Sequence, residues 1–158
     1  MLTVNLISVG KLKEKFLREA LAEYAKRLSA YCNFSIIEVD ECRLPDNPSQ
    51  SQIDKGMEKE AKDILRYAAK GELVAMCIEG TQMSSEELAI RLEQLSQHTG
   101  TVSFVIGGSF GLADEVKKQA SLHLSVSKMT FPHQLFRVML AEQIYRAFSI
   151  SNGGKYHK

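Results

Sequence analysis

Five short apolar runs, separated by segments of helical periodicity, constrain the fold of this chain more than any other feature. The runs are rich in β-branched residues and lie at 2–9, 34–39, 73–78, 102–106 and 122–127. They are mostly continuous rather than alternating, which is typical of strands covered by helices on both faces. Helical patterns lie near 12–29, 52–69, 85–96 and 112–120, and a fifth runs from Pro132 to about Ile150. The alternation predicts an α/β fold with a mostly parallel sheet and helices on both of its faces.

Local signals mark one loop and one helix start. The segment RLPDNPSQSQ at 43–52 contains two of the three prolines of the chain and predicts a loop. Ser84, followed three residues later by Glu87, predicts a capping box at the start of the third helix. At 158 residues the chain is most simply one domain, spanning 1–158.

Composition narrows the class of protein. Cys32, Cys42 and Cys77 are odd in number and widely spaced, which indicates neither a disulfide framework nor a zinc knuckle. No apolar run approaches the roughly 20 residues that span a bilayer, and the N-terminus does not have the pattern of a secretory signal. We therefore expect a reduced, cytoplasmic protein that does not enter a membrane.

Charge is unevenly distributed although the net charge is only +1. Residues 128–158 contain five Lys or Arg and one acid, whereas residues 38–63 contain eight acids and four bases. Such segregation can leave one basic face on a nearly neutral molecule, as a phosphate backbone requires. A solvated basic tail explains the same charges equally well.

The order of strands and helices also predicts where a ligand binds, because open parallel sheets hold ligands beyond the carboxyl ends of their strands. Three segments follow the last three apolar runs: EGTQMSS at 79–85, GGSFG at 107–111 and KMTFPH at 128–133. If those three strands are neighbours in the sheet, the segments converge. We expect the functional pocket there.

One of these segments fits G-x-S-x-G, the pattern of a hydrolase nucleophile elbow, with Ser109 as the nucleophile. Asp114 and three later histidines even give the Ser, acid, His order. However, Asp114 is better explained as an acid in the first turn of the next helix, and a Gly-rich oxyanion loop is missing. Glycines that let a bound group approach the backbone are the simpler interpretation. A serine hydrolase remains an alternative.

No phosphate-binding motif is present, since neither G-x-x-x-x-G-K-[ST] nor G-x-G-x-x-G occurs. A nucleoside without phosphates fits these segments better. Its purine would lie between apolar side chains while loop amides bind its edge. The side chains suited to this are Met76, Val126, Met129 and Phe131.

The final helical segment is apolar on most of its faces, from Leu135 to Ile150. A helix of this kind must be buried on most faces. Because an edge helix of a small monomer would be exposed to solvent on one side, we expect a second subunit to cover it. A helix wedged deep in its own core is the alternative.

Longer segments carry a resemblance to a known family. The chain resembles the bacterial ribosomal large-subunit methyltransferases that modify N3 of a pseudouridine, small members of the SPOUT superfamily, in SVGKLKEKF, IEG…MSSEELA, FVIGGSFGL, LSVSKMTFPHQLFRVMLAEQIYRAFSI and GGKYHK. The resemblance implies an α/β homodimer whose C-terminal chain forms a deep trefoil knot around the cofactor site. It also implies S-adenosylmethionine as cofactor, no metal, and a pseudouridine of 23S rRNA as substrate, in the intersubunit stem-loop near the decoding centre of an assembled ribosome.

The same resemblance implies where the cofactor binds. The family's cofactor positions fall on Met76, Gly107, Val126, Ser127, Lys128, Met129, Thr130 and Phe131. A leucine is common in the family where Met76 stands, and the two side chains have similar volumes.

N3 of pseudouridine is an imide N–H, so a base or a cation near it would assist methyl transfer. We take His133 and Arg137, one helical turn apart, as candidates, with Tyr156 and His157 reaching over from a partner subunit. His133 can equally be a helix-start residue bound to backbone groups, Arg137 a phosphate ligand, and the tail a frayed terminus. RNA binding is the expected role of Arg146, Lys155 and Lys158. Besides the hydrolase, a non-catalytic ribosome-binding module remains an alternative.

Overall fold

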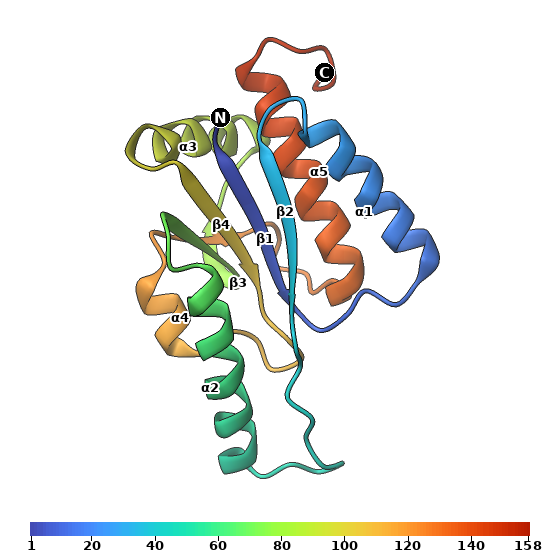
Figure 1. Ribbon diagram of the computed structural model, residues 1–158, viewed down its shortest axis with the longest axis vertical. Coiled ribbons are helices and arrows are strands. Elements are labelled where there is room, and N and C mark those ends of the chain that lie inside the picture. Colours follow the sequence, from blue (N-terminus) through green and yellow to red (C-terminus); the bar gives the residue numbers. More distant parts are fainter.

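Five strands alternate with five helices in the computed structural model, which describes residues 1–158 (Figure 1). The strands are β1 (Thr3–Val9), β2 (Asn33–Val39), β3 (Glu72–Gln82), β4 (Thr101–Ile106) and β5 (Leu122–Ser125). The helices are α1 (Lys15–Leu28), α2 (Gln50–Tyr67), α3 (Ser85–His98), α4 (Asp114–Gln119) and α5 (His133–Ser151). Every element that the hydrophobic pattern predicts is present, so the predicted α/β fold is confirmed.

The strands form one sheet in the order β2-β1-β4-β3-β5, and every pairing is parallel. The carboxyl ends of all five strands therefore lie at one end of the sheet. Because β4, β3 and β5 are adjacent, the segments that follow them emerge side by side. This is the arrangement on which the predicted pocket depends.

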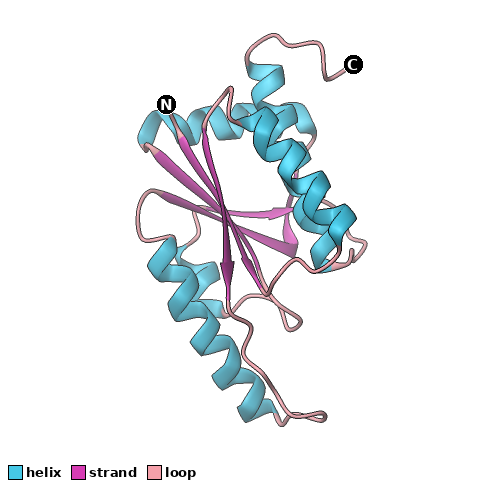
Figure 2. Cartoon of the chain, turned by 45° about the vertical axis from the view of Figure 1, so that its right-hand side comes forward, coloured by secondary structure: helices cyan, strands magenta, loops and turns pink.

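Helices cover both faces of the sheet, which explains why the strands are continuously apolar (Figure 2). Along β1, Val4 and Leu6 belong to the larger apolar core, beneath α1, α3 and α5. Ile7 and Val9 belong to the smaller core, beneath α2 and α4. Since both sets of side chains are buried, the strand shows no polar alternation.

Two local predictions need correction. The capping box lies at the start of α2, where Ser49 Oγ accepts from Gln52 N at 3.2 Å and Gln52 Oε1 accepts from Ser49 N at 2.8 Å. At α3, Ser84 Oγ accepts from Glu87 N at 3.1 Å, but the glutamate does not reach back. The same capping box ends the predicted loop early, because α2 already begins at Gln50.

Helix α5 packs between α1 and α3 on the larger core (Figure 1). Its buried positions are Arg137, Leu140, Ala141, Ile144, Ala147 and Ser149. Most of its other side chains are half-buried, and Leu135 remains 40% exposed. The subunit itself thus provides much of the cover that this apolar helix needs. None of the helices is long and apolar enough to span a bilayer.

Candidate functional site

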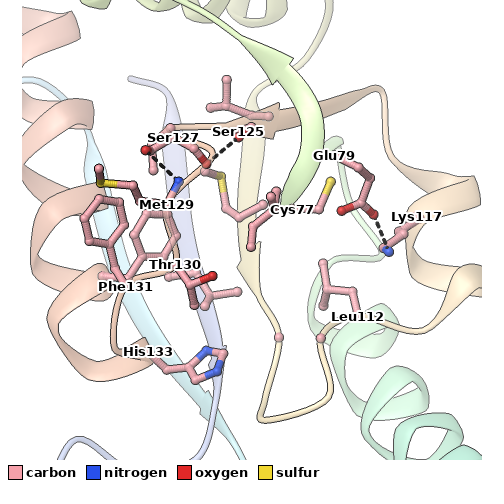
Figure 3. A pocket seen from close by; sticks show the side chains of 18 of the residues that line it. Cys77, Glu79, Leu112, Lys117, Ser125, Ser127, Met129, Thr130, Phe131 and His133 are labelled. Carbon is pink, nitrogen blue, oxygen red and sulfur yellow. Dashed lines mark hydrogen bonds and ion pairs between the residues drawn. The ribbon is translucent and has the colours of Figure 1, made fainter.

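The segments that follow β3, β4 and β5 meet around a cavity of about 310 Å³ at the carboxyl end of the sheet (Figure 3). Its walls are Met76–Glu79 from β3, Ile106, Gly107 and Phe110–Leu112 around the β4 turn, Lys117 of α4, Leu124–Ser127 and Met129–Phe131 after β5, and His133 and Phe136 of α5. The convergence expected from the strand order is therefore present. Most of the lining is apolar.

An irregularity in β3 forms one wall of the cavity. The ladder between β3 and β5 breaks between Met76 and Thr81 and resumes beyond it. A Cβ on Gly80 would stand 2.7 Å from the carbonyl of His123, so only glycine allows the two strands to approach here. A break of this kind redirects side chains from the ladder, and it leaves Cys77 and Glu79 lining the cavity.

A tight turn after β4 forms the opposite wall. Gly111 has φ +83° and donates its N–H to Gly108 O at 3.0 Å. A Cβ on Gly107 would lie only 2.5 Å from the carbonyl carbon of Gly111. The turn thus folds back onto Gly107, so glycine peptide groups line the cavity here beside the side chains of Phe110 and Leu112.

The segment after β5 is held by its own serines. Ser125 Oγ donates to Ser127 O at 3.0 Å, and Ser127 Oγ accepts from Met129 N at 3.0 Å. The ring of Phe131 stacks on Phe136 with a centroid separation of 6.5 Å. In Figure 3, Ser127, Met129 and Phe131 stand on one side of the cavity, and Glu79 of β3 stands on the other.

One ion pair lies at the rim of this apolar cavity. Lys117 Nζ donates to Glu79 Oε1 at 2.6 Å, and Glu79 is the only carboxylate among the lining residues. The hydrogen bond from Lys117 lowers the pKa of Glu79, so the carboxylate stays ionised at neutral pH. Flat apolar walls with peptide groups and one charged edge suit a nucleoside.

Seven of the eight residues expected at the cofactor site line the cavity: Met76, Gly107, Val126, Ser127, Met129, Thr130 and Phe131. Lys128 belongs to the same segment, but its exposed side chain is not part of the lining. The structure thus brings these residues together around one cavity, and cofactor binding by them remains a prediction.

The two candidates at the start of α5 lie in different surroundings. His133 lines the cavity, and its imidazole forms no hydrogen bond with the protein. Arg137 is 2% exposed and is not part of the lining. It donates to Glu38 Oε2 at 3.0 Å and to Val9 O at 2.9 Å. Burial lowers the pKa of Arg137, an effect that the Glu38 carboxylate opposes.

The tail candidates lie at the other end of the sheet from the cavity. His157 Nε2 donates to Glu86 Oε1 at 2.6 Å, while its Nδ1 is 3.0 Å from a guanidinium nitrogen of Arg146. Tyr156 packs edge-on against Tyr145 at 4.8 Å. The tail folds back along α5, where Tyr156 and His157 contact Glu142 and Arg146, nine and thirteen residues after His133; at 1.5 Å per residue these contacts lie roughly 14–20 Å along the helix from His133. Figure 1 shows the C-terminus at the end of α5 that faces away from the carboxyl ends of the strands.

The candidate RNA-binding cations share that distant end. Arg146 forms an ion pair with Glu142 at 2.7 Å and lies over the ring of Tyr156. Lys155 and Lys158 are exposed in the tail. Within one subunit, none of these cations lies beside the cavity.

Ser109 is not arranged as a hydrolase nucleophile. It is exposed at the tip of the β4 turn, outside the cavity lining, and its Oγ donates to Glu41 Oε1 at 3.2 Å. No histidine contacts it, and Asp114 begins α4 as the helix-dipole interpretation predicts. The glycines of the motif serve the turn instead.

Sequence reasoning missed the polar residues Glu38, Cys77, Glu79 and Lys117. Glu79 opens the first of the three converging segments, so its place after a strand was a usable signal. Lys117 comes from a helix with no motif. Glu38 reaches Arg137 from 99 residues away, and no sequence pattern marks that pairing.

Comparisons with known proteins agree on one family. A family model described as "Predicted SPOUT methyltransferase" matches residues 2–157. A Clostridium kluyveri protein named ribosomal RNA large subunit methyltransferase H is 48% identical over 159 residues, covering 99% of this chain and 100% of the relative. The Bacillus cereus protein of that name has the same identity and coverage. The fold is similar to that of a probable methylase family protein from Haemophilus influenzae Rd KW20, with TM-score 0.55 and 14% identity over 99% of this chain and 70% of that one.

Proposed function

This chain belongs to the SPOUT methyltransferase family, and from that premise we propose that it methylates N3 of a pseudouridine in 23S rRNA, with S-adenosylmethionine as methyl donor. The observation that carries the proposal is the cavity where the β3, β4 and β5 segments meet. Relatives at 48% identity over essentially their whole length bear the name of large-subunit rRNA methyltransferases. The substrate we propose is the intersubunit stem-loop near the decoding centre, within an assembled ribosome.

The cavity suits the adenosine part of the donor. Gly107 has no Cβ, so the β4 turn can fold back against it and bring the Gly111 peptide group to the cavity wall, where a base would meet it. Met76 and Phe131 provide apolar surfaces on two walls. When bound, S-adenosylmethionine supplies a methyl group activated by a sulfonium.

In such a transfer the protein contributes mainly by orienting the methyl donor and the base, which can lower the activation free energy by several kcal/mol. The segment 126–131 would hold the donor against β3 and β4, and the exposed His133 lines the same cavity. Because its imidazole forms no hydrogen bond within the subunit, His133 is free to accept the N3 proton of the base. We assign Arg137 an indirect role, since its guanidinium is held by Glu38 and the backbone.

A second copy of the chain completes the proposed site. Tyr156 and His157 do not line the cavity of their own chain, and their contacts with Glu142 and Arg146 hold them roughly 14–20 Å along α5 from His133. We propose that they act at a partner's cavity. Apolar side chains around the cavity and the start of α5 remain exposed in one subunit, among them Val126 at 40% and Met129 at 74%. We propose that a partner covers this surface in a homodimer and that the segment after β5 is part of a deep trefoil knot.

The test is to compare ribosomes before and after incubation with this protein and S-adenosylmethionine. The ribosomes are taken from a strain that lacks a homologous enzyme, and the nucleosides of their 23S rRNA are analysed by mass spectrometry. We expect one N3-methylpseudouridine to appear. Ser109→Ala should methylate as fast as the wild type, which would exclude the hydrolase. A protein that binds ribosomes but has no calorimetric affinity for S-adenosylmethionine would be a non-catalytic binding module, and the proposal would fail.

A further inference from the structure

The loop between β1 and α1 and the first turn of α1 form an exposed surface that no motif singles out. Between residues 11 and 18 there are four bases and a single acid. Lys11, Lys13, Lys15 and Arg18 are all exposed, and Phe16 among them is 66% exposed. We call residues 11–18 the basic loop. An aromatic ring left in water among cations is unusual, because burying such a ring would be worth about 1.5–3 kcal/mol.

The basic loop lies at the same end of the molecule as the cavity. Lys13 N donates to Gln134 Oε1 at 3.2 Å, which ties the loop to the first turn of α5. Gln134 follows His133, whose side chain lines the cavity. Figure 1 shows the loop passing beneath the start of α5. An RNA with one base at the cavity mouth would therefore lie beside the basic loop of the same subunit.

The backbone of the basic loop is held in place while its charges stay free. Leu12 is buried, and its N–H donates to Glu38 Oε2 at 2.8 Å. Arg18 donates to Lys13 O at 2.7 Å, which closes the loop onto the helix. The only ion pair of its lysines is Lys15 with Glu19 at 3.8 Å, and both side chains are more than half exposed. Exposed pairs of this kind are worth little, so they leave the cation available.

The cations of the tail end differ from these. Arg146 is engaged by Glu142 and by His157 within its own subunit. Phosphate binding there would compete with existing partners, whereas the lysines of the basic loop have almost none. Affinity for nucleic acid depends mainly on phosphate contacts from free Lys and Arg.

We propose that the basic loop binds the RNA backbone next to the methylated nucleotide, and that Phe16 stacks on an unpaired base beside it. This inference rests on the proposed function, because it needs an RNA at the cavity mouth. Unpaired bases of stem-loops are recognised by stacking on aromatic side chains while Lys and Arg hold the adjoining phosphates. Three exposed lysines followed by an exposed phenylalanine provide both.

Neutralising the lysines of the basic loop tests its proposed contacts with phosphates. The triple variant Lys11→Gln, Lys13→Gln, Lys15→Gln is compared with Lys55→Gln, Lys59→Gln, Lys62→Gln, which removes the same charge from exposed positions on α2. Binding to purified 70S ribosomes is measured at several salt concentrations. We expect the logarithmic salt slope of the first variant to fall by about 0.7–0.9 for each lost phosphate contact, and the α2 variant to match the wild type. Equal slopes in both variants would overturn the inference.

Replacing the ring tests the stacking. Phe16→Ala should weaken ribosome binding by roughly 5- to 150-fold, the range for loss of one stacked base. Phe16→Tyr should bind as the wild type, while Phe16→Leu, which keeps apolar volume but has no ring, should behave like Phe16→Ala. Tyr67→Ala, an exposed aromatic on α2, is the control and should have no effect. Wild-type binding by Phe16→Leu would indicate an apolar protein contact and contradict the inference.

A photoreactive residue identifies the partner directly. With p-benzoylphenylalanine in place of Phe16, irradiation on 70S ribosomes should give a crosslink to 23S rRNA. A crosslink to a ribosomal protein or to a second subunit would overturn the inference. The variants should keep the calorimetric affinity of the wild type for S-adenosylmethionine, and their KM for ribosomes should rise while kcat stays unchanged. Failure of the wild type to bind S-adenosylmethionine would instead count against the proposed function.

Discussion

The two ends of the sheet carry similar residues, but their polar groups differ in whether they have partners within the chain. At the carboxyl end, the segments after β3, β4 and β5 surround a cavity with exposed methionine, an unpaired histidine and open peptide groups. At the amino end, the tail folds onto α5, and Tyr156, His157, Glu142 and Arg146 satisfy one another. The first end is open to a ligand, and the second is closed within the subunit. The residues proposed for one reaction are thus divided between two regions roughly 14–20 Å apart along α5.

Removing the tail should have the largest effect. Deletion of Tyr156, His157 and Lys158 is expected to abolish methyl transfer and to change the affinity for S-adenosylmethionine by less than about twofold, because no tail residue lines the cavity. Methylation is followed by nucleoside mass spectrometry and cofactor binding by calorimetry. Full activity of the truncated protein would show that the closed end takes no part in the reaction.

A substitution at the open end should affect binding instead. In Gly107→Ala the new Cβ would stand 2.5 Å from the Gly111 carbonyl carbon, so the β4 turn must shift. Such overpacking costs about 1–3 kcal/mol, and we expect cofactor affinity to fall by about 10- to 100-fold. Gly100→Ala is the matched control, since a Cβ there meets nothing within 4 Å. Wild-type affinity of Gly107→Ala in calorimetry would place the cofactor away from this turn.

Replacing each of the two arginines of α5 compares how much the two ends contribute to the free energy of unfolding. Arg137→Met leaves the carbonyl of Val9 without this donor and Glu38 with only the N–H of Leu12, and we expect it to lower the free energy of unfolding by roughly 1–3 kcal/mol. The loss stays below that of a fully buried pair because the Glu38 side chain is 38% exposed. Arg146→Met should cost about 1 kcal/mol or less, because its helical pair with Glu142 is local. Urea denaturation measures both. Equal losses would mean that Arg137 does not hold α5 to the sheet.

The pKa of one carboxyl group at each end, Glu79 and Glu86, provides the test with the smallest and most local expected effect. The hydrogen bond from Lys117 lowers the pKa of Glu79, and that from His157 lowers the pKa of Glu86. A carboxyl group with a lowered folded-state pKa stabilises the fold above its ordinary pKa. That contribution is lost as the pH falls through the lowered value, so acid should weaken both contacts.

Carboxyl NMR titration separates the two ends. Lys117→Met should raise the pKa of Glu79 towards its ordinary value and leave that of Glu86 unchanged. His157→Ala should do the reverse. A shift of Glu86 in the Lys117 variant would reveal coupling between the two ends within one subunit.

The sequence predicted the elements well because β1, β4 and the first half of β3 are buried on both faces, and α1, α2 and α3 each bury an apolar stripe. It also predicted the place of the cavity, since the strand order only had to bring β3, β4 and β5 together. Capping was predicted less well. Ser49 with Gln52 and Ser84 with Glu87 look alike as patterns, and only the geometry of each turn decides which glutamine or glutamate reaches back.

Of the four catalytic candidates, the sequence could not tell that Arg137 is buried while His133 lines the cavity. The two side chains lie one turn apart on the same helix. Their difference comes from Glu38, which stands on β2 and accepts from both Leu12 N and Arg137. The basic loop escaped notice for a related reason, because only its contact with Gln134 on α5 brings it beside a residue that lines the cavity.

By itself, the sequence determined the α/β class, the converging loops and the glycine turn, because hydrophobic period and backbone freedom are local properties of the chain. The tertiary structure decided which charged groups are paired and which are free. Pairing depends on contacts between residues far apart in the chain, as between Arg137 and Glu38, and burial sets its strength.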